Sequence, residues 1–135
     1  MIIQEVKNNS QKQEFLDVAR IIYQNDTNWV CPLDMDIEAI FDPSKNNFHQ
    51  HGKCQRWILK SQEGELIGRI AAFINEEKAY QFEQATGGVG FFECVNDTQA
   101  SAMLFDTAKK WLADEGMAAM DGPINFGEND TFWGL

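Results

Sequence analysis

A carboxylate, a thiol and two imidazoles are the side chains of this sequence whose type and position suggest chemistry. Glu93 lies in an apolar segment, residues 89–95, where a carboxylate could act as a general base, directly or through a water molecule. The alternative is a structural charge that meets solvent or pairs with Arg56 or Arg69. Cys94 has neither histidine near it in the sequence, so a small buried apolar side chain is favoured over a nucleophile.

Two histidines and a cysteine lie close together at His49, His51 and Cys54. An extended segment would project both imidazoles to one face, but a metal site needs a further ligand and supporting partners that the sequence does not identify. A solvated loop is therefore favoured, and we expect no metal. The cysteines, with Cys31 and Cys94 the remaining two, are odd in number and form no C-x-x-C pair, so free thiols are expected.

Residues 96–100 follow the apolar segment and are typical of a helix start. Unpaired backbone N–H groups and the positive end of the helix dipole at such a terminus suit a phosphate or pyrophosphate. In the alternative, the side chain of Asn96, Asp97 or Thr98 caps the helix and takes those N–H groups, and the charge of Asp97 favours this. The glycine-rich residues 87–90 precede a strand, so they lack the geometry of a phosphate-binding loop.

The elements that position these side chains follow from hydrophobic periodicity. A first helix should begin at Ser10, with a capping box to Gln13, and should bury one stripe of its surface. That stripe consists of Phe15, Val18, Ala19, Ile22 and Tyr23. The other expected elements are strand 2–6, helix 34–41, polar loop 44–53, strands 56–60 and 66–75 joined as a hairpin, a weakly helical stretch 76–84, strand 89–95, a helix from 98 to 115 and strand 117–120.

This order of elements indicates the α/β (α+β) class with a mixed, mainly antiparallel sheet. The helix after residues 89–95 is expected to be a crossover that joins two parallel strands. A length of 135 residues fits a single domain, and 44% hydrophobic residues provide a core. The formal charge of −10 argues against a nucleic-acid partner or an anionic membrane surface. Without a signal peptide or an apolar run of about 20 residues, a cytoplasmic protein is expected.

The element order also resembles that of the GNAT superfamily of acetyl-CoA-dependent N-acetyltransferases, in its N-terminal portion. Several separated segments resemble a group of bacterial GNAT-like proteins. They are residues 23–33, 68–75, 90–94 and 122–126, and the pairs Trp111-Leu112 and Gly116-Met117. The resemblance covers nearly the whole chain and implies an N-acyltransferase domain over residues 1–135.

In the GNAT family, the strand that resembles residues 89–95 pairs with the pantetheine arm of acetyl-CoA, and the following helix start holds the pyrophosphate. The residues that the resemblance assigns to the cofactor are Phe92, Cys94, Val95, Thr98, Gln99, Ala100 and Ser101. A strand N–H near Cys94 would polarise the thioester carbonyl, and Glu93 or water would serve as the base. Residues 96–102 lack the glycines of the family's pyrophosphate pattern.

Two functions follow from these observations. The first is transfer of an acyl group from acetyl-CoA to an amine, and the second is a non-catalytic GNAT-like module. That module would bind a small ligand or a protein through the aromatic residues Phe126, Phe132 and Trp133. A complete GNAT domain resembles this chain up to Met120 and then continues, so we expect the fold to be incomplete at its C-terminus. The uncovered edge strand 117–120 would then pair in a homodimer or with a further part of a longer protein.

Overall fold

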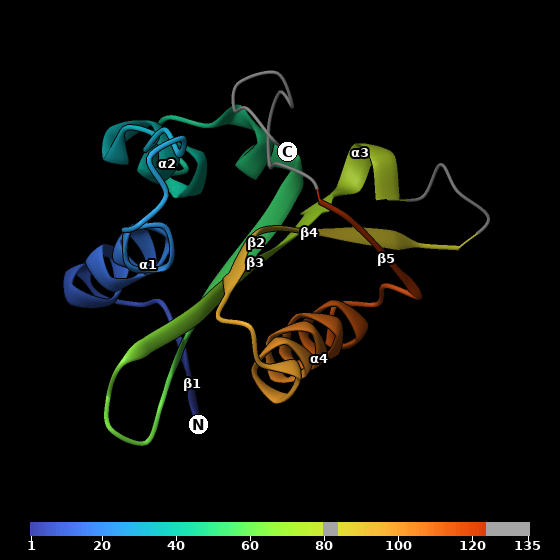
Figure 1. The fold of residues 1–135 in the computed structure, drawn as a ribbon. Helices are drawn as coiled ribbons and strands as arrows, with labels where there is room; N and C mark the ends of the chain where they lie inside the picture. Colours follow the sequence, from blue (N-terminus) through green and yellow to red (C-terminus); the bar gives the residue numbers. More distant parts are fainter. Residues whose placement is uncertain (80–83, 124–135) are drawn as a thin grey trace.

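A computed structural model describes residues 1–79 and 84–123, which form one sheet with helices on both faces (Figure 1). The elements in order are β1 (Ile2–Glu5), α1 (Asn9–Ile22), α2 (Asp34–Phe41), the 3-10 helix η1 (Asn47–His51), β2 (Gly52–Lys60), β3 (Leu66–Asn75), α3 (Glu76–Ala79), β4 (Thr86–Cys94), α4 (Thr98–Asp114) and β5 (Ala119–Asp121). Apart from η1, this order is the predicted one.

The sheet has the strand order β1-β2-β3-β4-β5, so each strand lies beside its neighbour in the sequence. β1, β2, β3 and β4 pair antiparallel, and β4 pairs with β5 in parallel through the crossover helix α4. The mixed, mainly antiparallel sheet of the sequence analysis is therefore confirmed. Gly64, with φ of +85°, closes the turn between β2 and β3, where the Ser61 amide donates to the Glu65 carbonyl at 2.9 Å.

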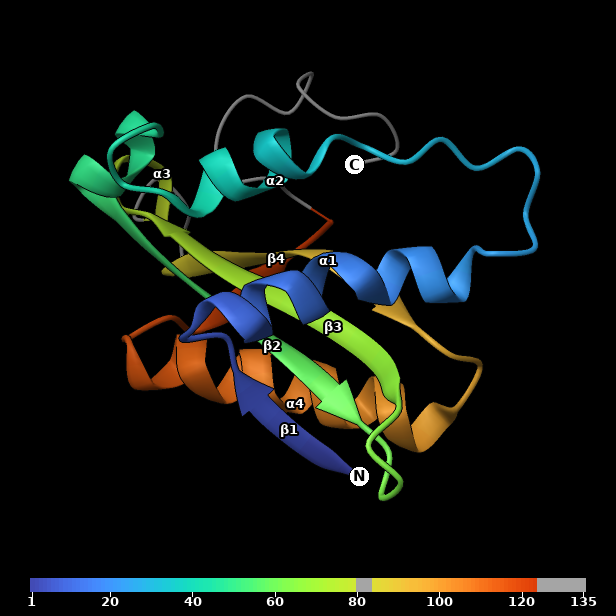
Figure 2. The same ribbon diagram turned by 90° about the vertical axis from the view of Figure 1, so that its left-hand side faces the viewer.

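Both faces of the central strands are covered, because alternate residues of β2 and β3 point to opposite layers. Trp57, Leu59 and Ile70 belong to the core beneath α4, whereas Ile58 and Phe73 belong to the core beneath α1 and α2. Figure 2 shows α1 and α2 on one side of the sheet and α4 on the other. Two helical layers thus enclose the strands that carry the candidate residues.

The start of α1 differs from the predicted one. Asn8 caps the helix, and its side chain accepts from the Gln11 amide at 2.8 Å while the Gln11 side chain accepts from the Asn8 amide at 3.3 Å. The capping box predicted at Ser10 and Gln13 is therefore wrong by two residues. The Lys7 amide also donates to the Gln11 side chain at 2.7 Å, and this bond has no counterpart in the predicted box.

The end of α4 explains why the last strand starts later than predicted. Gly116 has φ of +91°, and its amide donates to the Ala113 carbonyl while the Met117 amide donates to the Leu112 carbonyl. This pair of bonds is a Schellman motif, so Gly116 ends the helix as its position predicts, and Met117 belongs to the helix end rather than to the strand. β5 consequently spans Ala119–Asp121 instead of residues 117–120.

The segment between α2 and β3 also differs from its prediction. Residues 44–53 were expected to be a polar loop, but η1 forms within them and β2 begins at Gly52 instead of Arg56. The Asn46 side chain accepts from the Phe48 amide at 3.1 Å and caps this helical turn. The longer β2 gives β3 a partner along its length, so the hairpin is more extensive than its hydrophobic run indicated.

Candidate functional site

β4 contains a bulge at its centre. Arg69 of β3 pairs with Glu93 and Ala71 pairs with Gly90, so two residues of β4, Phe91 and Phe92, stand opposite one residue of β3. Phe91 has φ of +54°, a left-handed conformation that side chains with a β carbon rarely adopt. The bulge shifts the register of β4 immediately before Glu93.

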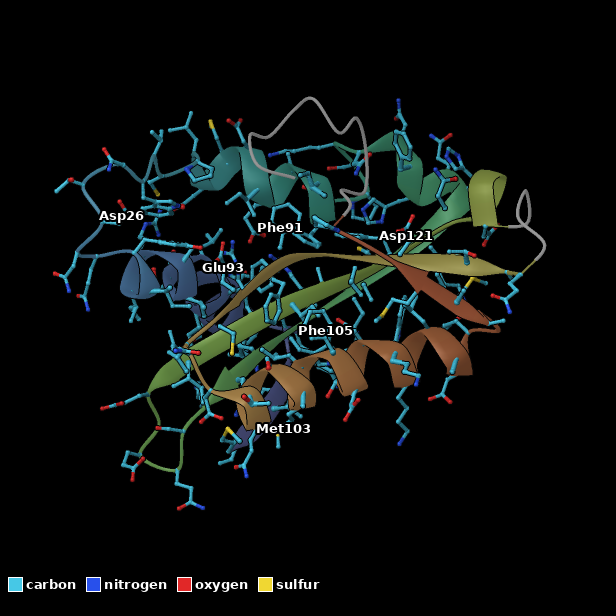
Figure 3. All side chains as sticks on the ribbon, turned by 45° about the vertical axis from the view of Figure 1, so that its right-hand side comes forward. Asp26, Phe91, Glu93, Met103, Phe105 and Asp121 are labelled. Atoms are coloured by element: carbon cyan, nitrogen blue, oxygen red, sulfur yellow. The ribbon has the colours of Figure 1, made fainter. Side chains whose placement is uncertain are left out.

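β4 continues beyond the end of β5. Within the described residues they pair from Thr86 to Gly88 on β4 and from Ala119 to Asp121 on β5, while β4 continues to Cys94. A cavity of about 1030 Å³ opens along this part of β4. Its lining includes Tyr23 and Trp29 after α1, Arg69 of β3, Phe91, Phe92 and Glu93 of β4, Phe105 of α4, and Asp121 and Pro123. Figure 3 labels several of these side chains around the opening.

Glu93, the predicted base, forms a hydrogen bond that joins the sheet to the end of α1. The Tyr23 hydroxyl donates to Glu93 Oε2 at 2.6 Å, and the Tyr23 ring stacks on Trp29 with ring centroids 5.2 Å apart. This bond and partial burial raise the pKa of Tyr23 to about 12, so the phenol keeps its proton and donates at neutral pH. Glu93 is therefore a positioned carboxylate in the cavity and not a solvated strand end.

Arg69 joins the bulge of β4 to α1 through its buried side chain. Its side chain is buried, and Nε donates to the Phe91 carbonyl and Nη1 to the Phe15 carbonyl, both at 2.9 Å. Burial lowers the pKa of Arg69 to about 10, while the charge of Glu93 acts in the opposite direction. The guanidinium thus ties the bulge to α1 and places a positive charge near the Glu93 carboxylate.

Arg56, the other predicted partner of Glu93, is engaged elsewhere. Its two terminal nitrogens donate to both carboxylate oxygens of Glu38 at 2.7 and 2.9 Å, and its guanidinium lies over the rings of Phe15 and Phe41. This bidentate pair links α2 to β2. Of the two arginines considered from the sequence, Arg69 is the one that interacts electrostatically with Glu93.

The first turn of α4 is capped by its own side chain. Asp97 accepts from the Gln99 amide at 2.8 Å and the Ala100 amide at 3.2 Å, and the Ser101 hydroxyl donates to the Thr98 carbonyl at 3.1 Å. Ala100 is completely buried. The self-capped alternative is therefore the one the structure contains, with Asp97 as the capping residue.

The predicted cofactor residues separate into two groups. Phe92 lines the cavity together with Glu93, and its ring packs against Phe105 at 4.5 Å. Cys94, Val95, Thr98, Gln99, Ala100 and Ser101 lie at the end of β4 and in the first turn of α4, outside the lining. Burial, with the charge of Asp97 as a smaller cause, raises the pKa of Cys94, in agreement with its interpretation as an apolar side chain.

The His49, His51 and Cys54 group was weighed as a metal site. His49 Nε2 lies 2.9 Å from the Ile40 carbonyl, and burial raises the pKa of the Cys54 thiol to about 11. In the part of the chain that the structure describes, no cluster of three or more potential metal ligands occurs. Among the same residues, no helix is both long and apolar enough to span a membrane.

Comparisons with known proteins place this arrangement in a wider context. The GNAT-family acetyltransferase from Staphylococcus aureus Mu50 superimposes with a TM-score of 0.56 at 16% identity, over 86% of this chain and 69% of that one. The aminoglycoside 6′-acetyltransferase AAC(6′)-Iy, solved with a CoA-containing bisubstrate analogue, gives 0.60 at 12% identity, over 92% and 79%. The chain has the fold of the GNAT acetyltransferases. The expected order of elements is the order of that fold.

A relative found by sequence comparison is much longer than this chain. Protein YghO of Escherichia coli (strain K12) is 27% identical over 128 residues, which are 95% of this chain and 32% of YghO. The chain therefore spans about a third of the length of this relative. No model of a known protein family matches the sequence.

Sequence reasoning missed the side chains that complete the GNAT-fold cavity. Tyr23 was placed on the buried stripe of α1, but its partner Glu93 is 70 positions away, and Trp29 stacks on it from the following loop. A tyrosine on an apolar stripe is itself a signal, because a buried hydroxyl needs a hydrogen-bond partner. Asp121 reaches the cavity from the last described strand.

Proposed function

We propose that this chain is a GNAT-like N-acyltransferase domain that transfers an acyl group from a thioester, of which acetyl-CoA is the expected example, to an amine. The observation that carries the proposal is the Tyr23–Glu93 hydrogen bond inside the cavity, along the part of β4 that extends beyond β5. A carboxylate held in this way is suited to general-base chemistry next to a bound amine. The GNAT fold supports the proposal independently.

Glu93 supplies the proton acceptor in this proposal. Glu93 takes one proton from the protonated amine before the attack, directly or through water. Amide formation then joins the amine nitrogen to the carbonyl carbon of the thioester, the carbon–sulfur bond breaks, and the sulfur leaves as a thiolate. That thiolate takes up the second proton released by the nitrogen and becomes a thiol. Tyr23 acts as a positioning residue, because its hydroxyl fixes Oε2 of the carboxylate without losing its own proton at neutral pH.

The walls of the cavity favour a cationic amine with an apolar part. The lining contains four carboxylates against the two guanidinium groups of Arg20 and Arg69, and Trp29 and Phe105 contribute aromatic surface. The carboxylates belong to Asp26, Asp34, Glu93 and Asp121. Carboxylates attract a protonated amine, and aromatic faces favour a cation placed over them. Glu93 would then receive the proton that such an amine must release before it reacts.

The cavity and the helix terminus differ in how well they suit acetyl-CoA. Within the described residues Gly122 lies against Val89 on the β5 side, and β5 pairs with β4 only up to Gly88. The edge from Gly90 to Cys94 is therefore the part that we propose for the pantetheine arm. The first turn of α4 does not fit the pyrophosphate, because Asp97 occupies the amides of Gln99 and Ala100. The proposed chemistry therefore depends on the thioester end of the donor.

Calorimetric titration and turnover together test this proposal. Wild-type protein should give heat with S-acetyl-pantetheine and should release thiol when a panel of primary amines is added. Glu93→Gln should retain donor binding but lose at least about a hundredfold in turnover, as expected for a missing general base. Tyr23→Phe, which keeps the ring, should lose about tenfold through poorer positioning of the carboxylate.

Glu65→Gln is the matched control, because Glu65 is an exposed carboxylate in the loop between β2 and β3. It should behave as wild type in both measurements. If neither S-acetyl-pantetheine, acetyl-CoA nor desulpho-CoA gives heat at millimolar concentration, the acyltransferase proposal is wrong. Wild-type activity in Glu93→Gln would instead remove Glu93 from the catalytic role.

The capped start of α4 favours a second candidate, a non-catalytic GNAT-like module. Asp97 fills the place at which the family holds pyrophosphate, as expected if the fold has kept its cavity without CoA-dependent turnover. Ligand binding without thiol release from any amine would support this function. Phe126, Phe132 and Trp133, through which such a module was expected to bind a partner, lie outside the described residues. The homodimer expected from the edge strand stays a prediction.

A further inference from the structure

The start of α4 combines two features that act against a diphosphate. The first is geometric: the Asp97 carboxylate already accepts from the Gln99 and Ala100 amides, the donors that a phosphate at this terminus would use. Ala100 is completely buried, so its side chain is fixed against the core beneath α4. A bound phosphate would have to displace a carboxylate that is part of the helix itself.

The second feature is the charge of the surrounding sequence. No Lys, Arg or His occurs between Lys78 and Lys109, while that stretch contains Glu83, Glu93 and Asp97 together with Asp106. Phosphate recognition in proteins depends on cationic side chains or on open N–H groups at a helix start. Neither β4 nor the first half of α4 offers a cation, and the cap occupies two of the amides.

We infer that Asp97 is a specificity-determining residue that excludes a diphosphate, so the donor of this domain is an acylated pantetheine-type thiol without the adenosine diphosphate part of CoA. The inference rests on the proposed function, since it names the donor class of that reaction. The reacting thioester and the pantetheine arm would lie along the open edge of β4. Figure 3 shows β4 leading through a short connection into α4. The diphosphate and adenosine of CoA would have to lie beside this connection.

Paired ligands and paired variants test the inference. Acetyl-CoA and S-acetyl-pantetheine share the thioester and the arm, and differ in the diphosphate and adenosine. Asp97→Asn keeps a good capping residue but removes the charge, whereas Asp97→Gly removes the side chain and frees both amides. Asp106→Asn removes an equal charge from an exposed position of the same helix and serves as the control. It lies nine residues after Asp97, about 13.5 Å farther along the axis at about 1.5 Å per residue.

Wild-type protein should bind S-acetyl-pantetheine at least about tenfold more tightly than acetyl-CoA, because the diphosphate meets a filled and negatively charged helix start. Affinity for acetyl-CoA should rise from wild type to Asp97→Asn and again to Asp97→Gly, by at least about tenfold in all, because a freed helix start attracts anions. Affinity for S-acetyl-pantetheine should stay unchanged in each variant, and Asp106→Asn should match wild type. Circular dichroism melts verify that every variant keeps its helix.

Equal or tighter binding of acetyl-CoA by wild type would overturn the inference and leave the acyltransferase proposal intact. Equal gains for both donors in Asp97→Gly would also overturn it, because the effect would then not depend on the diphosphate. Absence of binding of either donor by wild type and all variants would overturn the proposed function, and the inference with it.

Discussion

Replacement of Arg69 by methionine tests whether the buried guanidinium holds the bulge of β4. The substitution removes two hydrogen bonds of 2.9 Å, to the carbonyls of Phe91 and Phe15, and keeps an apolar side chain of similar length. The Phe91 carbonyl loses a buried donor at a cost of about 1–3 kcal/mol, whereas the Phe15 carbonyl stays in the hydrogen-bond ladder of α1 and its loss is about 0.5–1.5 kcal/mol. Contact of the cation with the Phe15 ring, 4.8 Å from its centroid, adds about 0.5–2 kcal/mol. Relief from burying a cation offsets part of this sum. We expect Arg69→Met to lose about 3 kcal/mol of unfolding free energy.

Urea denaturation followed by tryptophan fluorescence measures this loss. With an m-value of about 2 kcal/mol per molar, the midpoint should fall by about 1.5 M without a change in m. Arg20→Met is the matched control, because Arg20 is half-exposed and pairs with Asp17 and Asp34, so it should lose less than about 1 kcal/mol. A loss below about 1 kcal/mol in Arg69→Met would refute the reasoning. The free-energy cost of burying the guanidinium would then be as large as the stabilisation by its hydrogen bonds.

Three other substitutions test separate parts of the structure. Gly87→Ala should lower the free energy of unfolding by about 1–3 kcal/mol in thermal or urea denaturation. A β carbon at residue 87 would lie 2.5 Å from a methyl group of Leu112 in α4. Unchanged stability would contradict this packing. Glu93→Gln should lower the pKa of Tyr23 from about 12, since the charged acceptor is its main cause, and ultraviolet difference titration between pH 9 and 12 should show earlier ionisation than in wild type. Asn8→Ala should lower the free energy of unfolding in urea by about 1 kcal/mol, and Ser10→Ala should leave it almost unchanged. A larger loss in Ser10→Ala than in Asn8→Ala would show that Ser10, as predicted from the sequence, caps the helix.

Much of the fold was predictable because hydrophobic spacing determines which faces are buried. The strand over residues 66–75 and the helix over 34–41 have the predicted bounds, since a continuous apolar run and an Asp-Pro stop mark their ends. Local polar bonds were harder to assign. Asn8 to Gln11 and Ser10 to Gln13 have the same spacing and end in the same residue type, so the sequence offers two equivalent boxes.

The candidate site was predictable only where one residue carries the signal. Glu93 was selected because it is a carboxylate within an apolar strand, and the structure places it in the cavity. Its partners come from remote parts of the chain: Tyr23 from the end of α1, and Arg69 from the strand opposite the bulge. The bulge decides this geometry, and a non-glycine residue at positive φ leaves no local mark in the sequence. The Asp97 cap was foreseen as an alternative because its acceptors and donors are only two and three residues apart.

The short parallel pairing of β5 has a consequence for how the cavity changes width over time. β2 and β3 are paired along nine positions, whereas β5 is paired with β4 at three. Segments with few interstrand bonds and few buried contacts open at a lower free energy than the rest of a domain, and Met120 is already exposed. The amides of residues 119–121 should therefore exchange with deuterium well before those of β2 and β3. One wall of the cavity is then a locally opening strand, which allows ligands of different bulk to enter without disturbing the two cores.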